Sequence, residues 1–266
     1  MARTFDIRKQ TGFTALAITC FAVLYMPIVL LVVYSFNAGS SIAIWEGFSF
    51  RWYATAWDND QVQAATIRSL VIACCASGIA TFAAVLAALA TTRTKPWKGQ
   101  TLAFAMVNQP LMVPEIVTAV ALLIFFAMIK VSTGYTGLGY LILAHSAFCI
   151  PFAYLPVRAR LQGMDLTLEQ AASDLYATPF QIFRRITLPQ LFPGILAGAM
   201  LAFVISLDDV VITEFVKSAG QDTLPTYMLG QLRRVVTPEI NAISTVLLAI
   251  SVVMVIAFFF LSRVRK

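Results

Sequence analysis

Apolar residues dominate long stretches of this 266-residue chain, and short polar segments separate them. A helix that crosses the hydrocarbon core of a bilayer needs about 20 mostly apolar residues. Six stretches meet this requirement, and they lie at roughly 13–36, 66–91, 101–129, 137–157, 191–216 and 241–262. The first is too long for the core of a signal peptide and is interpreted as a retained span. The pattern predicts an all-α membrane protein of six transmembrane helices, with residues 1–266 in one domain.

Composition and charge lead to the same interpretation. The chain has 59% hydrophobic and 12% charged residues, which is outside the usual range of soluble globular domains. Cytoplasmic loops of membrane proteins carry an excess of Lys and Arg, and a topology with both termini in the cytoplasm satisfies this rule. It places these basic residues inside: Arg3, Arg8, Lys9, Arg93, Lys95, Lys98, Arg158, Arg160, Arg184, Arg185, Arg263, Arg265 and Lys266. Insertion topology thus explains the net charge of +6, and no nucleic-acid partner is needed.

One polar segment, residues 168–189, has a pattern of its own. A small apolar face at helical spacing is formed by Leu168, Ala171, Ala172 and Leu175. Thr178 then has the features of a helix N-cap, with Pro179 at the first helical position and Gln181 three residues past the cap. The second helix is expected to stop before Pro189. Two short helices between membrane spans suggest a surface that docks a partner.

The same segment resembles the EAA loop of binding-protein-dependent ABC importer permeases, which reads Glu-Ala-Ala, then Gly, then Ile-x-Leu-Pro. The matching positions are Ala171, Ala172, Asp174, Leu175, Ala177, Ile186, Leu188 and Pro189. In that family the loop is a coupling helix seated in a cleft of the ATPase subunit, and the resemblance implies this role for residues 168–189. The implied ATPase contacts are Glu169, Gln170, Ala171, Ala172, Asp174, Tyr176, Ala177 and Phe180.

Two positions depart from the family pattern. Gln170 stands where the family has Glu, and Glu169 lies one residue earlier. Either Glu169 supplies the ionic contact from about 100° round the helix, or Gln170 keeps a neutral hydrogen bond there. Tyr176 stands where the family has Gly, at the end of the first helix. Gly adopts a left-handed backbone there freely, whereas Tyr pays about 1 kcal/mol, so the corner is expected to be shaped differently in this chain.

The later part of the chain resembles a narrower group, the second permease subunit of spermidine/putrescine importers. Four strings carry this resemblance: residues 206–211 (SLDDVV), 214–216 (EFV), 224–225 (LP) and 237–242 (TPEINA). It implies an all-α permease of the bacterial inner membrane that moves a polyamine. The implied partners are a homologous permease subunit, two ATPase subunits, an external substrate-binding protein and membrane lipid. The chain has no P-loop sequence, so ATP and Mg would be bound by the partner ATPase and no cofactor by this chain.

Acidic residues inside the apolar spans are the candidate substrate contacts. A charge at the bilayer centre costs roughly 2.5–3.5 kcal/mol and is functional by default. The acids are Glu115, Asp208, Asp209 and Glu214, and several carboxylates along one path would suit a polycation. On a continuous helix Asp208 and Asp209 are about 100° apart, with Asp208 on a stripe with Val211, Ile212 and Phe215. One of the two aspartates is expected to face the path. The other would cap a helix break, bind a basic residue or meet the partner permease.

Asn108 and Phe203 complete the candidate substrate path, with Phe203 offering a cation–π surface. Pro110 and Pro114 interrupt the third span just before Glu115. Each proline frees a backbone carbonyl that protein or cavity water must satisfy. The kink either forms a wall of the path, which the family resemblance favours, or serves packing alone.

No catalytic or metal-binding constellation is evident. His145 is the only histidine, and it is interpreted as an interhelical hydrogen-bonding group. The cysteines are interpreted as small packing residues. Two rival classes are an autonomous secondary transporter and a purely structural subunit. The first is disfavoured by the lack of an inverted repeat and the second by the intramembrane acids. An alternative cargo is another small cationic or zwitterionic nitrogen compound.

Overall fold

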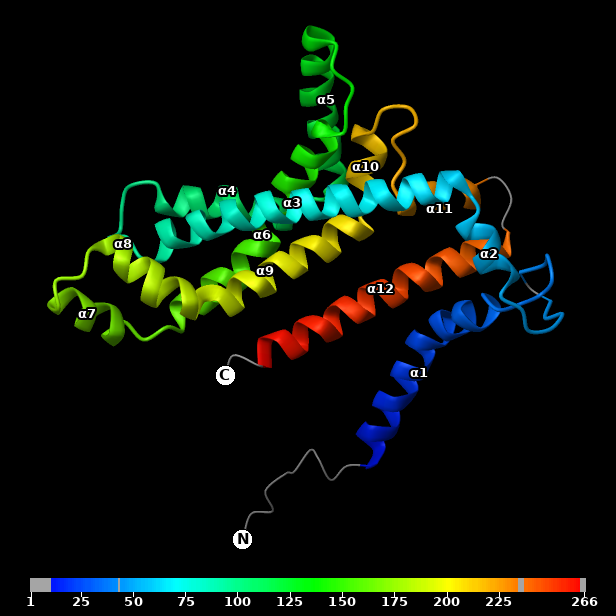
Figure 1. Cartoon of the computed structure of the whole chain (residues 1–266), viewed down its shortest axis with the longest axis horizontal. Coiled ribbons are helices and arrows are strands. Elements are labelled where there is room, and N and C mark those ends of the chain that lie inside the picture. The colour runs from blue at the N-terminus through cyan, green and yellow to red at the C-terminus, as the bar shows by residue number, and fades with distance from the viewer. Residues whose placement is uncertain (1–10, 43, 234–236, 264–266) are drawn as a thin grey trace. The chain divides into compact units, whose positions relative to one another are not determined.

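The computed structural model describes residues 11–42, 44–233 and 237–263, and within them helices account for nearly all regular structure (Figure 1). The helices are α1 (Thr11–Tyr34), α2 (Arg51–Trp57), α3 (Asp60–Thr92), α4 (Gln100–Met112), α5 (Glu115–Thr133), α6 (Gly139–Gln162), α7 (Thr167–Asp174), α8 (Pro179–Ile182), the π-helix η2 (Phe183–Thr187), α9 (Leu188–Asp208), α10 (Val211–Val216), α11 (Leu224–Leu232) and α12 (Pro238–Arg263). Arg3, Arg8, Lys9, Arg265 and Lys266 of the topology argument lie outside the described residues.

Six helical segments are long and apolar enough to cross a membrane. They are Gly12–Tyr34, Asp60–Thr92, Glu115–Thr133, Gly139–Gln162, Pro179–Asp208 and Pro238–Ala257. The prediction of an all-α protein with six spans is therefore confirmed. The second span begins earlier than predicted, because α3 begins at Asp60 and not near residue 66. The boundaries differ most for the third and fifth spans.

The third predicted span, 101–129, is two separate helices and not one kinked helix. Val113 has an extended backbone (ψ 137°) and ends α4, while Pro114 precedes the first residue of α5. A proline pushes the residue before it out of the helical region, which explains a break at this point. Pro110 lies inside α4 without ending it. Only α5 is long enough to span the membrane by itself, and Figure 1 shows the chain turning sharply between the two helices.

The fifth predicted span, 191–216, is also interrupted, and here the expected stripe of Asp208, Val211, Ile212 and Phe215 is wrong. Helix α9 ends at Asp208, and Asp209 is extended (φ −64°, ψ 131°) before α10 begins. No glycine or proline marks this interruption in the sequence. The backbone leaves the helix here because the Asp209 side chain caps the next one.

The chain divides into two compact units, one within Met1–Asp60 and Gln231–Ile250 and the other within Gln61–Gly230 and Ser251–Lys266. In the first unit the Asn37 side chain organises the loop after α1. Its amide donates to the carbonyl oxygens of Ser41 and Ile44, and its oxygen accepts from the Glu46 N–H. Trp52 of α2 is buried and donates to the Gly39 carbonyl.

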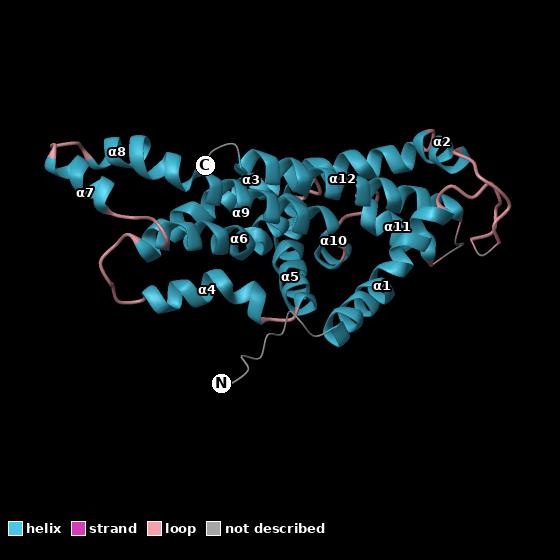
Figure 2. Ribbon diagram, turned by 90° about the horizontal axis from the view of Figure 1, so that it is seen from below, coloured by secondary structure: helices cyan, strands magenta, loops and turns pink. Residues whose placement is uncertain are grey.

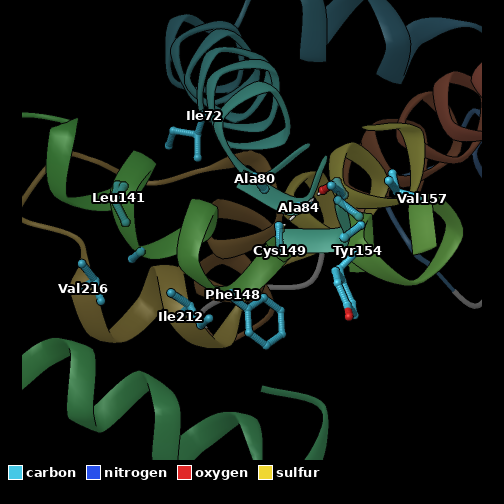
Figure 3. Packing of buried hydrophobic residues seen from close by; sticks show 14 of the residues in the cluster. Ile72, Ala80, Ala84, Leu141, Phe148, Cys149, Tyr154, Val157, Ile212 and Val216 are labelled. Atoms are coloured by element: carbon cyan, nitrogen blue, oxygen red, sulfur yellow. Dashed lines mark hydrogen bonds between the residues drawn. The ribbon is translucent and has the colours of Figure 1, made fainter. Parts of the chain in front are cut away.

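In the second unit α6 and α9 form the most extensive helix pair of the core. Gly194 and Gly198 of α9 are buried four residues apart, and a Cβ at Gly198 would lie 2.6 Å from the Ala153 carbonyl oxygen of α6. Small residues at this spacing let the two backbones approach closely. Cys149 fills the same contact and is buried, as expected for a packing residue (Figure 3). Cys20, Cys74 and Cys75 are exposed on this chain, so the same prediction is wrong for them within this chain.

Candidate functional site

A buried polar cluster lies at the α9–α10 break and is formed by His145, Ser206, Asp209 and Thr213. His145 of α6 is 1% exposed, with its Nδ1 2.8 Å from the Ser206 hydroxyl and its Nε2 2.9 Å from the Thr213 hydroxyl. The cluster therefore joins α6 to the end of α9 and to α10. The prediction that His145 is an interhelical hydrogen-bonding group is confirmed.

Asp209 caps α10 from inside this cluster. Its Oδ1 accepts from the Thr213 N–H at 2.9 Å and from the Thr213 hydroxyl at 3.1 Å, and its Oδ2 accepts from the Ile212 N–H at 3.4 Å. The Thr213 hydroxyl thus gives its proton to Asp209 and accepts from His145 Nε2. In a neutral imidazole ring, Nδ1 then accepts from the Ser206 hydroxyl. The hydrogen bonds then run in one order: Ser206 donates to His145, His145 donates to Thr213, and Thr213 donates to Asp209.

The two neighbouring aspartates have different surroundings. The Asp209 side chain is 2% exposed, whereas Asp208 at the end of α9 is exposed. Glu115, the first residue of α5, is half-buried and interacts with Asp209 through their side chains. The structure thus brings Glu115 to the α9–α10 break and leaves Asp208 as the aspartate with an accessible carboxylate.

The remaining candidate path residues are less accessible or already paired. Asn108 and Phe203 are buried, and the Asn108 amide donates to the Phe104 carbonyl of its own helix. Glu214 forms an ion pair with Lys217, which also contacts Asp222. The role of all these residues in a substrate path stays a prediction.

Lys217 follows α10 and belongs to a polar network at that end of the unit. Burial alone would lower the pKa of Lys217, but hydrogen bonds and charge from Asp222 and Glu214 outweigh it and raise the pKa. Arg68 near the start of α3 donates to the Asp222 carbonyl at 2.6 Å, and Lys130 of α5 donates to the Val216 carbonyl at 3.0 Å. The network therefore fastens the segment after α10 to α3 and α5.

A cavity of about 580 Å³ lies beside the α4–α5 break. It is lined by Met106, Val107, Gln109, Pro110, Val117, Thr118, Ala121, Leu122, Phe125, Ala147, Phe148 and Ile150. The Thr118 hydroxyl has no hydrogen-bond partner among the described residues. None of the candidate acids lines this cavity. The residues of the polar cluster at the α9–α10 break do not line it either.

Residues 168–189 have the helix N-cap that their sequence predicts. Thr178 and Gln181 form a capping box, in which the Thr178 N–H donates to the Gln181 side chain at 2.9 Å and the Gln181 N–H donates to the Thr178 hydroxyl at 3.4 Å. Helices α7 and α8 lie together at one end of the second unit (Figure 2). The start of the second helix at Pro179 is confirmed, but its expected end before Pro189 is wrong, because α8 continues through η2 into α9 and the helical segment runs unbroken from Pro179 to Asp208.

Tyr176 adopts the left-handed backbone that suits glycine, with φ +57°, so the expectation of a differently shaped corner is wrong. The Ala177 N–H donates to the Ala172 carbonyl and the Tyr176 N–H to the Ser173 carbonyl, both at 3.0 Å. This pair of bonds defines a Schellman motif, in which glycine is the usual residue at the left-handed position. The Tyr176 side chain is 95% exposed, so no burial offsets the strain.

Glu169 and Gln170 face different surroundings. Glu169 Oε1 accepts from the Thr187 hydroxyl at 2.9 Å and lies 3.4 Å from Nη2 of Arg93. Gln170 is exposed, as are Ala171 and Asp174. Glu169 therefore reaches a basic group, but one of its own chain.

Sequence reasoning missed several residues that the structure brings to these sites. Ser206 and Thr213 carry no signal in the sequence beyond a hydroxyl inside an apolar span, and Arg93 enters the sequence argument through topology alone. The N-cap preference of aspartate is the one signal that pointed to the Asp209 break. Among the described residues, no three His, Cys, Asp or Glu side chains gather in a way that could hold a metal ion.

Comparison with known proteins places the chain in a family. Residues 80–265 match the family described as binding-protein-dependent transport system inner membrane component. The putrescine transport system permease protein PotI of Escherichia coli K12 is 37% identical over 250 residues, which cover 92% of this chain and 89% of PotI. The spermidine/putrescine permease PotC of the same organism is 37% identical over 243 residues, or 91% of this chain and 90% of PotC.

Solved structures share the fold. A bacterial ABC transporter involved in the import of the acidic polysaccharide alginate matches with a TM-score of 0.72 at 18% identity, over 95% of this chain and 94% of that one. The MetNI methionine ABC transporter matches with a TM-score of 0.61 at 18% identity, over 78% of this chain and 99% of that one. The family match and the 37% identity to PotI and PotC, together with the six apolar helices, show that the chain is a multi-pass inner-membrane protein and belongs to the permease family of binding-protein-dependent transport systems, in the group that contains PotI and PotC.

Proposed function

We propose that this chain is the permease subunit of an importer whose cargo is a polyamine such as spermidine or putrescine. The observation that supports this cargo is the 37% identity, over about nine tenths of the chain, to two permeases named for putrescine and spermidine. The acidic residues in the apolar spans agree with a cationic cargo, because a carboxylate attracts an amine more strongly in a low-dielectric cavity than in water.

Asp208 and Glu115 are the residues proposed to meet the cargo. Asp208 is exposed on this chain at the end of α9, and Glu115 opens α5 directly after the Pro114 break. Asp209 takes a different part, because its oxygens are already used to cap α10. In this assignment Asp209 holds the break and Asp208 offers the charge.

Residues 168–189 are proposed to dock an ATPase subunit that binds ATP and Mg. In α7 the face formed by Leu168, Gln170, Ala171 and Asp174 is exposed, and the aromatic side chains of Tyr176 and Phe180 in the same segment are exposed too. A homologous permease would complete the path, a second ATPase would serve that partner, and an external binding protein would deliver the cargo.

Both termini are proposed to lie in the cytoplasm. The Arg93–Glu169 ion pair joins the end of α3 to α7, and the Arg68–Asp222 bond joins the start of α3 to the segment after α10. These contacts sit at opposite ends of α3, as the six-span topology requires. Cysteines introduced at the exposed residues Lys98 and Ala219 and labelled from either side of sealed vesicles would test the assignment.

Uptake of radiolabelled putrescine and spermidine by cells whose own copy of the gene is replaced tests the function. Asp208→Asn should reduce uptake at least several-fold at equal membrane abundance, whereas Asp165→Asn in an exposed cytoplasmic turn should not. Unlabelled amines added in excess identify the cargo. If neither polyamine is taken up, while choline or a basic amino acid is, the polyamine proposal fails and the alternative nitrogen compound replaces it.

A further inference from the structure

Helix α7 is held to the rest of the chain by very few contacts. None of its residues is buried, and only Glu169 and Ala172 are partly covered. They lie three residues apart and therefore share one face of the helix. The covered face points toward the chain's own membrane helices, and Ala172 is too small to anchor it there by burial of apolar area.

Glu169 supplies the polar contacts of that face. Its Oε1 is shared by Arg93, which directly follows α3, and Thr187, which directly precedes α9. Arg93 and Glu169 are largely covered, with side-chain exposures of 18% and 20%, and Thr187 is buried. One carboxylate oxygen thus links α7 to the ends of two long helices that cross the membrane.

The glutamate of α7 is at residue 169, one position before the residue where the family has Glu, and this shift explains why its carboxylate faces Arg93 and Thr187. Residues 169 and 170 are about 100° apart on a helix, so the carboxylate at 169 faces inward while Gln170 faces outward. A contact of Glu169 with a partner protein would require breaking both contacts with Arg93 and Thr187. The sequence left open an ionic ATPase contact through Glu169 or a neutral hydrogen bond through Gln170. The directions of the two side chains favour Gln170.

From this geometry we infer that Glu169, Arg93 and Thr187 form a tether that makes α7 move together with α3 and α9, and that Glu169 is a positioning residue and not an ATPase contact. The inference rests on the proposed docking role of residues 168–189. An ATPase that pulls or pushes α7 would transmit its movement to α3 and α9 through this tether, since α7 has no buried apolar anchor to do so. The ATPase contact at the family position then belongs to Gln170.

The tether itself can be tested without any partner. Backbone amide hydrogen exchange of residues 167–174 is measured in the purified full chain in lipid nanodiscs. Glu169→Gln and Arg93→Gln should each speed hydrogen exchange there at least three-fold. The double variant Arg93→Glu with Glu169→Arg, in which the two charges are swapped (the exchanged pair), should recover at least half of that change. Asp165→Asn is the matched control, because it also removes one carboxylate from the same loop and an asparagine can still accept from the Thr167 N–H. Unchanged exchange in Glu169→Gln would overturn the tether.

The coupling role is tested in the assembled transporter, purified through a tag on this chain. Glu169→Gln should keep the amount of bound ATPase within two-fold of wild type while transport per ATP hydrolysed falls at least five-fold, and the exchanged pair should restore it. Loss of ATPase binding in Glu169→Gln, not restored by the exchanged pair, would overturn the inference and make Glu169 a direct contact. If the wild-type chain binds no ATPase, the proposed function fails, whereas the exchange experiment still decides whether the tether exists.

Discussion

Replacing Tyr176 by glycine should stabilise the corner between α7 and α8. Tyr176 has a left-handed backbone (φ +57°), which costs a residue with a Cβ roughly 1–2 kcal/mol. Glycine adopts this backbone freely but gives back about 0.5–1 kcal/mol as extra entropy of the unfolded chain. Because the tyrosine side chain is 95% exposed, its removal sacrifices little burial. The net gain is about 0.5–1 kcal/mol.

Such a gain slows local opening of the corner about two- to five-fold, since about 1.4 kcal/mol corresponds to a factor of ten. Amide hydrogen exchange of residues 171–177 measures it, because the Tyr176 and Ala177 amides make the two bonds of the Schellman motif. Tyr176→Ala is the matched control, because it removes the same ring and keeps the backbone cost. If Tyr176→Ala slows exchange as much as Tyr176→Gly, or if Tyr176→Gly does not slow it, the strain argument is refuted.

Three further predictions concern the membrane helices. Gly198→Ala should destabilise the purified protein by about 1–3 kcal/mol, because its Cβ would strike the α6 backbone, whereas Gly78→Ala, which meets no atom within 4 Å, should not lower the melting temperature in detergent. His145→Ala should cost about 2–4 kcal/mol in denaturant titrations, since it leaves a void and unpaired hydroxyls in the buried polar cluster; a loss below 1 kcal/mol would contradict that cluster. Asp209→Ala should lower thermal stability through the lost helix cap, by about 1–2 kcal/mol, while Asp208→Asn should lower uptake and leave stability unchanged. The opposite pattern would reverse the two assignments.

Several features of this protein are fixed by short stretches of its sequence. The six spans follow from the length of the apolar runs, because a bilayer accepts only segments that satisfy their own backbone hydrogen bonds. The α8 start follows from Thr178, Pro179 and Gln181, whose capping geometry involves only neighbours in the chain. Each of these depends on interactions within about one helical turn, which a sequence pattern can represent.

The polar contacts between helices could be decided only by the tertiary structure. Nothing near Asp209 in the sequence shows that His145, more than 60 residues away, closes the cluster at the α9–α10 break. The direction of Glu169 likewise depends on Arg93, which arrives from the end of a different helix. A carboxylate inside an apolar span or an exposed loop can be satisfied by a cap, a basic residue or a partner, and these solutions have the same local sequence. Packing of α3, α6 and α9 brings one partner within hydrogen-bonding distance, and this placement decides which solution the protein uses.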